Sequence, residues 1–229
     1  MAADHQNRDS VAQVRDAATD PETVRRPRVY VIGPNKCGTT SFFKFFRKNG
    51  IVTAHWVYQG RNLAVTMINN MALGRAPFAG FDEVEAFADL NHIEENQVFI
   101  EGARFFREIH RHDPDAYFIL NTRDIDNWIA SRVNYGLSKP VARINATTVE
   151  AVLDGWRTMF RTHHDEVRAH FADNPRFIEF NIETDSIRRV VRLLAPHYAL
   201  KPKAWGKHFV TADRHERLER LAREDAAQP

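Results

Sequence analysis

Short apolar runs alternate along the chain with segments in which apolar residues recur at helical spacing. A short apolar run bounded by turn residues is typical of a buried strand, whereas apolar residues three and four apart indicate a helix. Strands are predicted at residues 28–32, 51–57, 98–100, 116–121 and 176–180. Helices are predicted at residues 42–48, 61–73, 82–87, 103–110, 125–135, 148–171 and 186–194. This alternation predicts an α/β fold of three layers, with a mostly parallel central sheet and helices on both faces.

Three segments fall outside this alternation. Residues 1–27 are polar and poor in large apolar side chains, which predicts a flexible lead-in before a single domain at residues 28–229. Residues 138–145 are expected to form a mobile loop. Residues 213–223 are expected to form a charged helix.

The loop between the first strand and the first helix is the most informative stretch. It reads Gly33-Pro34-Asn35-Lys36-Cys37-Gly38-Thr39-Thr40-Ser41. Backbone N–H groups and the positive end of a helix dipole converge on an anion in such a strand–loop–helix unit. The Gly33–Gly38 spacing fits a P-loop, but Thr39 stands where a nucleotide triphosphatase carries Lys, and the Lys lies inside the loop as Lys36. We therefore predict a P-loop-like nucleotide site that holds a phosphate with different chemistry at its far end.

A second cluster of polar residues follows the strand at 116–121. Arg123 ends that strand, and Ser131 lies two turns into the next helix, so the two can grip one phosphate together. Two separate phosphate sites suggest a nucleotide with phosphates at both ends. The alternative is a capping network, in which Arg123 pairs with Asp124 or Asp126 and Ser131 simply faces a helix.

These two motifs together resemble the sulfotransferase family. The loop resembles its 5′-phosphosulfate loop, and Arg123 with Ser131 resembles its 3′-phosphate site. The resemblance implies 3′-phosphoadenosine 5′-phosphosulfate (PAPS) as sulfuryl donor, a hydroxyl or amine as acceptor, and no metal. By position, the donor's 5′ end would be bound by Pro34, Asn35, Lys36, Cys37, Gly38, Thr39, Thr40 and Ser41.

Direct sulfuryl transfer needs a group that stabilises the leaving phosphate and a base for the acceptor. We assign the first role to Lys36, since a cation beside the bridging oxygen stabilises the charge that develops there. His55 is the first choice of base, because it ends a strand expected beside the first strand and its ordinary pKa is near 6.5. Glu101 is the second choice and His92 the third. His55 could instead be a structural histidine bonded to backbone, and Glu101 could pair with Arg104 or Arg107.

Several other polar residues have simpler interpretations. The basic segment 201–209 could close over the nucleotide, with Lys207 on a phosphate and Trp205 and Phe209 on the adenine, or could be a solvated loop. Cys37 is interpreted as a small residue that fits beside a phosphate rather than a redox group, since the chain has one cysteine. His163 and His164 lack metal-site spacing and are predicted at the surface.

Composition narrows the class of protein. The net charge of +2 does not demand nucleic acid as a partner, and no apolar run is long enough for a membrane span. One unpaired cysteine fits a reducing compartment, so we expect a cytoplasmic enzyme. Residues 56–87 are mixed apolar and basic and are expected to wall the pocket of a small-molecule or glycan acceptor.

Two other functions stay open. The chain could be an atypical P-loop kinase that binds ATP with Mg²⁺, or a non-catalytic nucleotide-binding module of the same fold. Against the kinase, Thr39 fills the Walker Lys slot, and no apolar strand in the predicted set ends in an Asp directed at Mg²⁺.

Overall fold

The computed structural model describes residues 25–94, 98–206 and 208, and its centre is a seven-stranded sheet. The strand order is β4-β3-β2-β5-β1-β8-β9. Five strands run parallel: β1 (Val29–Val31), β2 (Thr53–His55), β5 (Ala86–Ala88), β8 (Tyr117–Thr122) and β9 (Phe177–Asn181). Two short strands add antiparallel pairs at one edge, β3 (Val57–Tyr58) and β4 (Arg61–Asn62).

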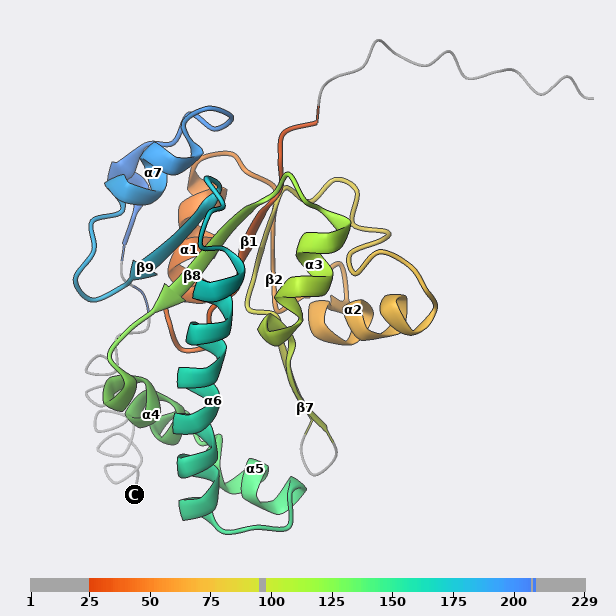
Figure 1. The fold of residues 1–229 in the computed structure, drawn as a ribbon, viewed down its shortest axis with the longest axis vertical. Coiled ribbons are helices and arrows are strands. Elements are labelled where there is room, and N and C mark those ends of the chain that lie inside the picture. Colours follow the sequence, from red (N-terminus) through yellow and green to blue (C-terminus); the bar gives the residue numbers. More distant parts are fainter. Residues whose placement is uncertain (1–24, 95–97, 207, 209–229) are drawn as a thin grey trace, which may run out of the picture.

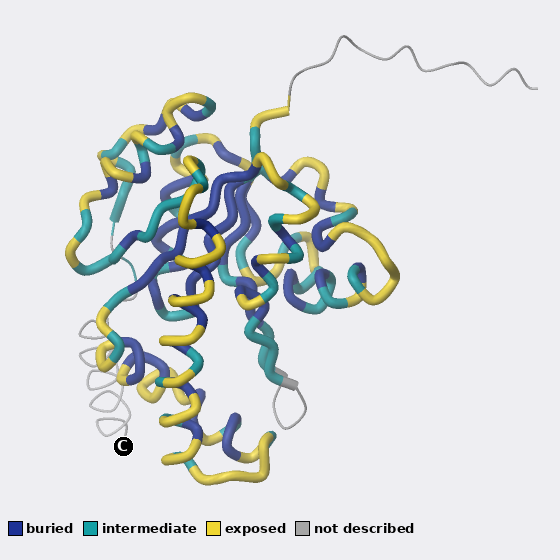
Figure 2. The backbone as a smooth tube through the Cα atoms, viewed as in Figure 1, coloured by how far each residue is buried: buried dark blue, intermediate teal, exposed yellow. Residues whose placement is uncertain are grey.

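Helices cover both faces of the sheet, which confirms the predicted fold class (Figure 1). One face packs against α1 (Thr39–Lys48) and α7 (Arg188–Leu194). The opposite face packs against α2 (Leu63–Ala72), α3 (Phe106–His112) and the end of α6 (Val149–His170). The inner parallel strands β1, β5 and β8 are buried along their length (Figure 2), because a sheet covered on both faces exposes neither side to water, whereas the edge strand β9 is mostly half-buried.

A smaller cluster extends from the carboxyl edge of the sheet. It joins α4 (Ile125–Asn134), α5 (Ser138–Ile144) and the first half of α6 around the aromatic side chains of Trp128, Trp156 and Phe160. Beside it lies an antiparallel hairpin of β6 (Asn91–Glu94) and β7 (Val98–Glu101), followed by the 3₁₀ turn Gly102–Phe105. A second 3₁₀ turn, Pro202–Ala204, follows α7. None of the helices within the described ranges is both long and apolar enough to cross a membrane.

Two predicted elements are wrong. Residues 82–87, predicted as a helix, overlap the start of β5. This strand lies between β1 and β2, so His55 is not on the strand next to β1. A three-residue buried strand carries no periodicity that could separate it from a helix. Residues 138–145, predicted as a mobile loop, form α5, because Val141 and Ala142 are buried against α6.

The expectation for two histidines is wrong, and one predicted strand lies outside the central sheet. His163 and His164 were expected at the surface but are 3% and 2% exposed on the inner face of α6. The predicted strand at 98–100 is part of β7, in the hairpin rather than the central sheet. Residues 1–24 of the lead-in and the charged helix at 213–223 lie outside the described residues.

Candidate active site

The loop between β1 and α1 is held in shape by its neighbour β8. Asn121 at the end of β8 accepts a hydrogen bond from the Gly33 N–H at 2.7 Å and donates one to the Cys37 carbonyl at 2.8 Å. A Cβ on residue 33 would lie 1.9 Å from the Asn121 carbonyl oxygen, so only glycine fits there. Trp128 of α4 donates from Nε1 to the Asn35 carbonyl at 2.9 Å. The loop is therefore fixed before any ligand binds.

Two residues of this loop have left-handed backbone conformations. Gly38, with φ of 80°, precedes α1, and its carbonyl accepts from the N–H groups of Ser41 and Phe42. Lys36 has φ of 65°, a conformation that costs energy in a residue with a Cβ and that is common at functional sites. The first turn of α1 contains no acidic residue of its own, and the positive end of a helix dipole favours a negative charge. An anion suits this position.

The Lys36 side chain extends toward α4. Its Nζ lies 3.9 Å from the centroid of the Tyr135 ring, which directly follows α4. The face of an aromatic ring attracts a cation, so this contact orients the ammonium group.

A group of five polar residues lies on the other side of the loop. His55, the last residue of β2, places Nε2 3.5 Å from the Thr40 hydroxyl and 3.5 Å from an Asp89 carboxylate oxygen. Asp89 directly follows β5, and the same oxygen accepts from the Thr39 hydroxyl at 3.3 Å. Asn91 donates to the other oxygen of Asp89 at 3.1 Å. The structure thus brings His55 to the loop although a strand separates it from β1.

Asp89 is the site residue that the sequence interpretation missed. The sequence does show an acid directly after the apolar run Ala86–Ala88, as expected at the end of a strand. It was missed because most of that run was assigned to a helix. Asp89 has φ of 57°, the left-handed region in which Asp is among the more tolerated residues. One argument against a kinase is therefore wrong, because an apolar strand beside β1 does end in Asp.

The environment of His55 favours the neutral imidazole. Burial lowers its pKa below 6.5, and this effect outweighs the Asp89 charge and a backbone hydrogen bond, which both raise it. The imidazole ring lies 5.0 Å from the Phe43 ring of α1, centroid to centroid. A neutral imidazole close to a carboxylate is an arrangement suited to accepting a proton.

Arg123 lies beside the loop, and an acid from β9 holds it there. Its Nε and Nη2 donate to Glu183 at 3.1 and 2.7 Å, and its Nη1 lies 3.4 Å from the Lys36 carbonyl. The alternative pairing with Asp124 or Asp126 is wrong, because Asp124 instead caps α4 by accepting from the Asp126 and Asn127 N–H groups. Arg123, from the second predicted phosphate site, is therefore in contact with the loop of the first.

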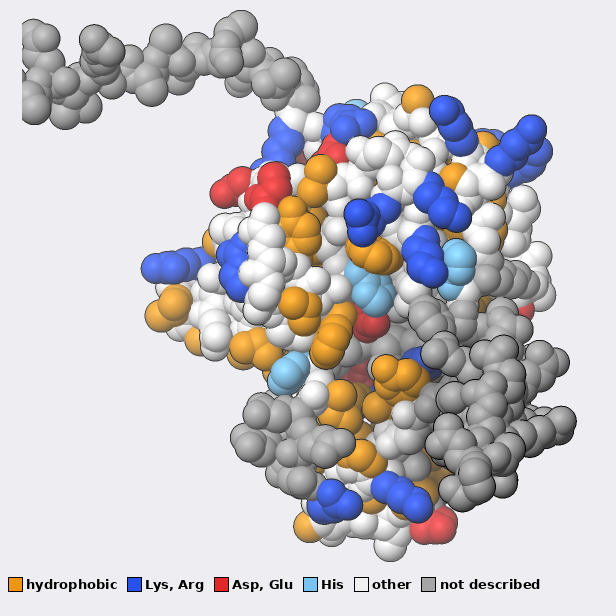
Figure 3. Space-filling view, turned by 180° about the vertical axis from the view of Figure 1, so that it is seen from behind, with side chains coloured by type: hydrophobic (Ala, Val, Ile, Leu, Met, Phe, Trp, Pro, Cys, Tyr) orange, Lys and Arg blue, Asp and Glu red, His pale blue; other side chains and the backbone are white. Residues whose placement is uncertain are grey.

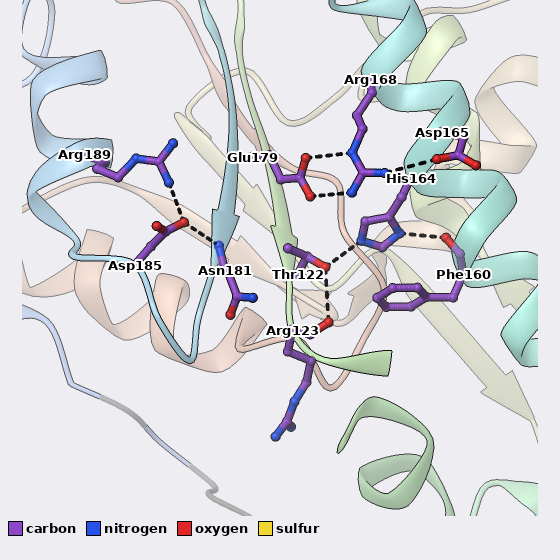
Figure 4. Close-up of polar contacts among 10 residues, drawn as sticks. All are labelled: Thr122, Arg123, Phe160, His164, Asp165, Arg168, Glu179, Asn181, Asp185 and Arg189. Atoms are coloured by element: carbon purple, nitrogen blue, oxygen red, sulfur yellow. Dashed lines mark hydrogen bonds and ion pairs between the residues drawn. The ribbon is translucent and has the colours of Figure 1, made fainter. Parts of the chain in front are cut away.

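Behind Arg123, a buried histidine supports the end of β8. His164 of α6 places Nδ1 2.7 Å from the Phe160 carbonyl and Nε2 2.8 Å from the Thr122 hydroxyl (Figure 4). Nδ1 faces a carbonyl and therefore carries a proton, and in the neutral ring Nε2 is then the acceptor that faces the Thr122 hydroxyl. Burial lowers its pKa to about 4, in agreement with this tautomer. Ser131, the expected partner of Arg123, is buried on α4.

Glu101 is the partner of a buried cation. Its carboxylate lies 2.7 Å from Nη2 of Arg132, a side chain with no exposed surface, and Arg104 and Arg107 are not its partners. The Arg132 guanidinium also lies 4.1 Å from the centroid of the Trp156 ring. Removing the charge of Glu101 would leave a buried cation uncompensated, which favours a structural role over proton transfer. His92, the third choice, lies on the β6–β7 hairpin.

The remaining expectations concern the end of the chain and Cys37. The Trp205 ring packs against the core, with its centroid 5.0 Å from that of the Phe42 ring. Lys207 and Phe209 lie outside the described residues. The Ser41 hydroxyl accepts from the His208 N–H at 3.0 Å. Burial raises the pKa of the Cys37 thiol well above its usual range, so it is a neutral, enclosed group. Within the described ranges, no group of three or more His, Cys, Asp or Glu side chains could hold a metal ion.

The fold and this loop define an α/β protein with an anion site at the carboxyl edge of a parallel sheet. Residues 28–171 match the family model described as the sulfotransferase domain. The match covers more than half of the 229 residues, so the chain belongs to this sulfotransferase family. The resemblance read from the two motifs is thereby confirmed. No curated protein matches the chain.

Proposed function

We propose that this chain transfers a sulfuryl group from PAPS to a hydroxyl or amine of an acceptor, directly and in line. The observation that carries the proposal is the contact between Arg123, from the second predicted phosphate site, and the loop of the first, since its side chain reaches the carbonyl of Lys36. A nucleotide with phosphates at both ends needs two cationic sites at one sheet edge. Membership of the sulfotransferase family supports the same reaction.

The loop and the start of α1 would bind the 5′-phosphosulfate. Residues 35–40 would supply backbone N–H groups, and Thr39, Thr40 and Ser41 would supply their hydroxyls, while Pro34, which has no N–H, would only line the loop. Arg123 and Ser131 would bind the 3′-phosphate. Glu183 neutralises Arg123 as it stands, so we expect Arg123 to exchange part of this pairing for the phosphate. Lys207 remains a further proposed phosphate ligand.

Two groups would carry the chemistry. The acceptor oxygen forms a bond to sulfur while the bond from sulfur to the phosphate oxygen breaks, and the electron pair stays on that oxygen. Lys36 would stabilise the negative charge left there. His55 would take the acceptor's proton at its imidazole. Asp89, beside Nε2, would stabilise the imidazolium once the proton has moved.

Variants of Lys36 and Arg123 separate the two roles. Lys36→Ala should lower turnover with PAPS and a panel of phenol, alcohol and amine acceptors by about 10²- to 10³-fold, with little change in nucleotide affinity. Arg123→Ala should weaken binding of the desulfated product, 3′-phosphoadenosine 5′-phosphate, by roughly tenfold or more. Titration calorimetry gives the affinities, and Lys48→Ala, an exposed position on α1, is the matched control. Equal effects of both variants on affinity and turnover would refute the assignment.

The kinase alternative gains one observation. Asp89 ends a strand next to β1 and contacts Thr39, which is where a P-loop enzyme needs an acid for Mg²⁺. Thr39 still occupies the position of the Walker Lys, so the sulfuryl reaction is the better supported one. The third alternative, a non-catalytic module, predicts product-nucleotide binding with no transfer to any acceptor of the panel.

A further inference from the structure

A hollow lies along the outer side of α1, next to the strands β2 and β3. It has a volume of ≈ 500 Å³. Its walls include Phe43, Arg47, Val52, His55, Val57 and Tyr58. A second hollow, of ≈ 550 Å³, is lined by residues such as Pro114 and Arg176 near the amino ends of β8 and β9, away from the loop. Only the first of these two includes a residue of the candidate site, His55.

One stripe of α1 leads from the loop along this hollow. Thr40, Phe43 and Arg47 are three and four residues apart and share a face of the helix. Thr40 lies 3.5 Å from His55, so the stripe begins at the proposed base. Seven residues at 1.5 Å each place the backbone of Arg47 about 10 Å further along the helix.

The walls are apolar in the middle and cationic at the far end. Val52 and Val57 are 40% and 39% exposed, which is a large exposure for valine, and the Phe43 ring packs against the His55 ring. Arg47 is exposed, its guanidinium lies 5.4 Å from the centroid of Phe43, and it forms no ion pair with a described carboxylate. Among the described residues that line the hollow there is no acid. Figure 3 shows the same mixture on this face, with Lys and Arg side chains gathered beside hydrophobic and histidine side chains.

We propose that this hollow binds the acceptor, and that the acceptor is an amphipathic hydroxy acid. Its hydroxyl lies at His55, its aromatic or aliphatic body lies on Phe43 and Val57, and an anionic group roughly 10 Å away pairs with Arg47. The inference rests on the proposed function, since His55 is the proposed base. It narrows the range of possible acceptors, which otherwise includes aromatic compounds, lipid-like compounds and acidic sugars, to molecules with an apolar body and one anionic end.

Arg47 also has a structural explanation that the test must separate. It lies in the last turn of α1, where a cation offsets the negative end of the helix dipole. Lys48 shares that turn and that charge but does not line the hollow. Lys48→Gln is therefore the matched control for Arg47→Gln, because both remove one exposed cation from the same helix end.

The test is an NMR titration of the protein with para-hydroxyphenylbutanoate and with its primary amide, in the absence of nucleotide. The wild-type chain should bind the carboxylate up to about fivefold more tightly than the amide, as expected of an exposed ion pair. Arg47→Gln should abolish this preference, whereas Lys48→Gln and the charge-conserving Arg47→Lys should keep it.

Two results would overturn the inference: equal binding of the two probes by the wild-type chain, or loss of the preference in Lys48→Gln to the same degree as in Arg47→Gln. The titration needs neither donor nor turnover. A failure of the proposed function, seen as absent nucleotide binding, is therefore distinguishable from a failure of the acceptor site. Far-UV circular dichroism and thermal melts of each variant verify that it is folded.

Discussion

The properties of single residues at this site depend on one or two close contacts, and the pKa of His55 is the clearest example. Burial lowers its pKa, while the Asp89 carboxylate 3.5 Å from Nε2 raises it. Burial is the larger effect, so the imidazole is neutral near pH 7, while the Asp89 carboxylate is positioned to stabilise the protonated form. Asp89 is thus expected to be a positioning residue, because it acts through His55.

The pH profile tests this pairing. A base must be neutral to accept a proton, so kcat/KM should fall as the pH decreases through the lowered pKa of His55. Asp89→Asn removes the charge that raises this pKa, so the acidic limb should move to lower pH while the plateau drops by about 10- to 100-fold. Rates measured between about pH 5 and 8 give both quantities. An acidic limb that stays in place in Asp89→Asn would show that Asp89 does not act on the base.

The residues predicted from the sequence are those whose chemistry is unusual for their position. Arg123 stands directly after an apolar strand and Lys36 lies in the short loop after another, where no packing requirement explains a cation, and the two residues are in contact. Glu183 and Asp89 were not found. An acid after a strand is a common turn residue, and its role appears only when the neighbouring strand brings a partner to it.

At the scale of elements, α6 supports the site from behind. Periodicity predicted the length of this helix well, as residues 148–171, but its two adjacent histidines were expected at the surface. Continued from Phe160 by three and four residues, the same periodicity reaches His163, His164 and Val167, all of which are buried. Helical spacing alone would therefore have predicted that the two histidines are buried, but both were assigned to the surface because they are polar.

His164 should make the fold sensitive to acid. Its folded-state pKa of about 4 lies below the ordinary value of 6.5, so the unfolded chain binds a proton first as the pH falls. Its stabilisation is complete above pH 6.5 and is lost as the pH falls toward 4, by on the order of 2–3 kcal/mol. Urea denaturation of His164→Gln between about pH 7 and 4 should show a shallower loss than the wild type. His112→Gln, an exposed histidine on α3, is the control, and an unchanged slope in His164→Gln would contradict the assignment.

At the scale of the whole molecule, the parallel sheet collects the site. One polar residue lies at or after the carboxyl end of each of the five parallel strands, in the order of the sheet. His55 ends β2, Asp89 directly follows β5, Lys36 lies in the loop after β1, Arg123 directly follows β8, and Glu183 lies two residues after β9. Ligands of open α/β sheets bind at this edge. The alternation of apolar segments was enough to predict the layers. It could not place β5 between β1 and β2, because strand order depends on packing between distant segments.

The central claim is that this edge binds a nucleotide with phosphates at both ends. Titration calorimetry of the wild-type chain with 3′-phosphoadenosine 5′-phosphate, without divalent cations, tests it most directly. We expect one site with an affinity on the order of micromolar, and no comparable binding of ATP with Mg²⁺. Absence of binding by the bisphosphate, or tight binding of ATP only when Mg²⁺ is present, would contradict the account.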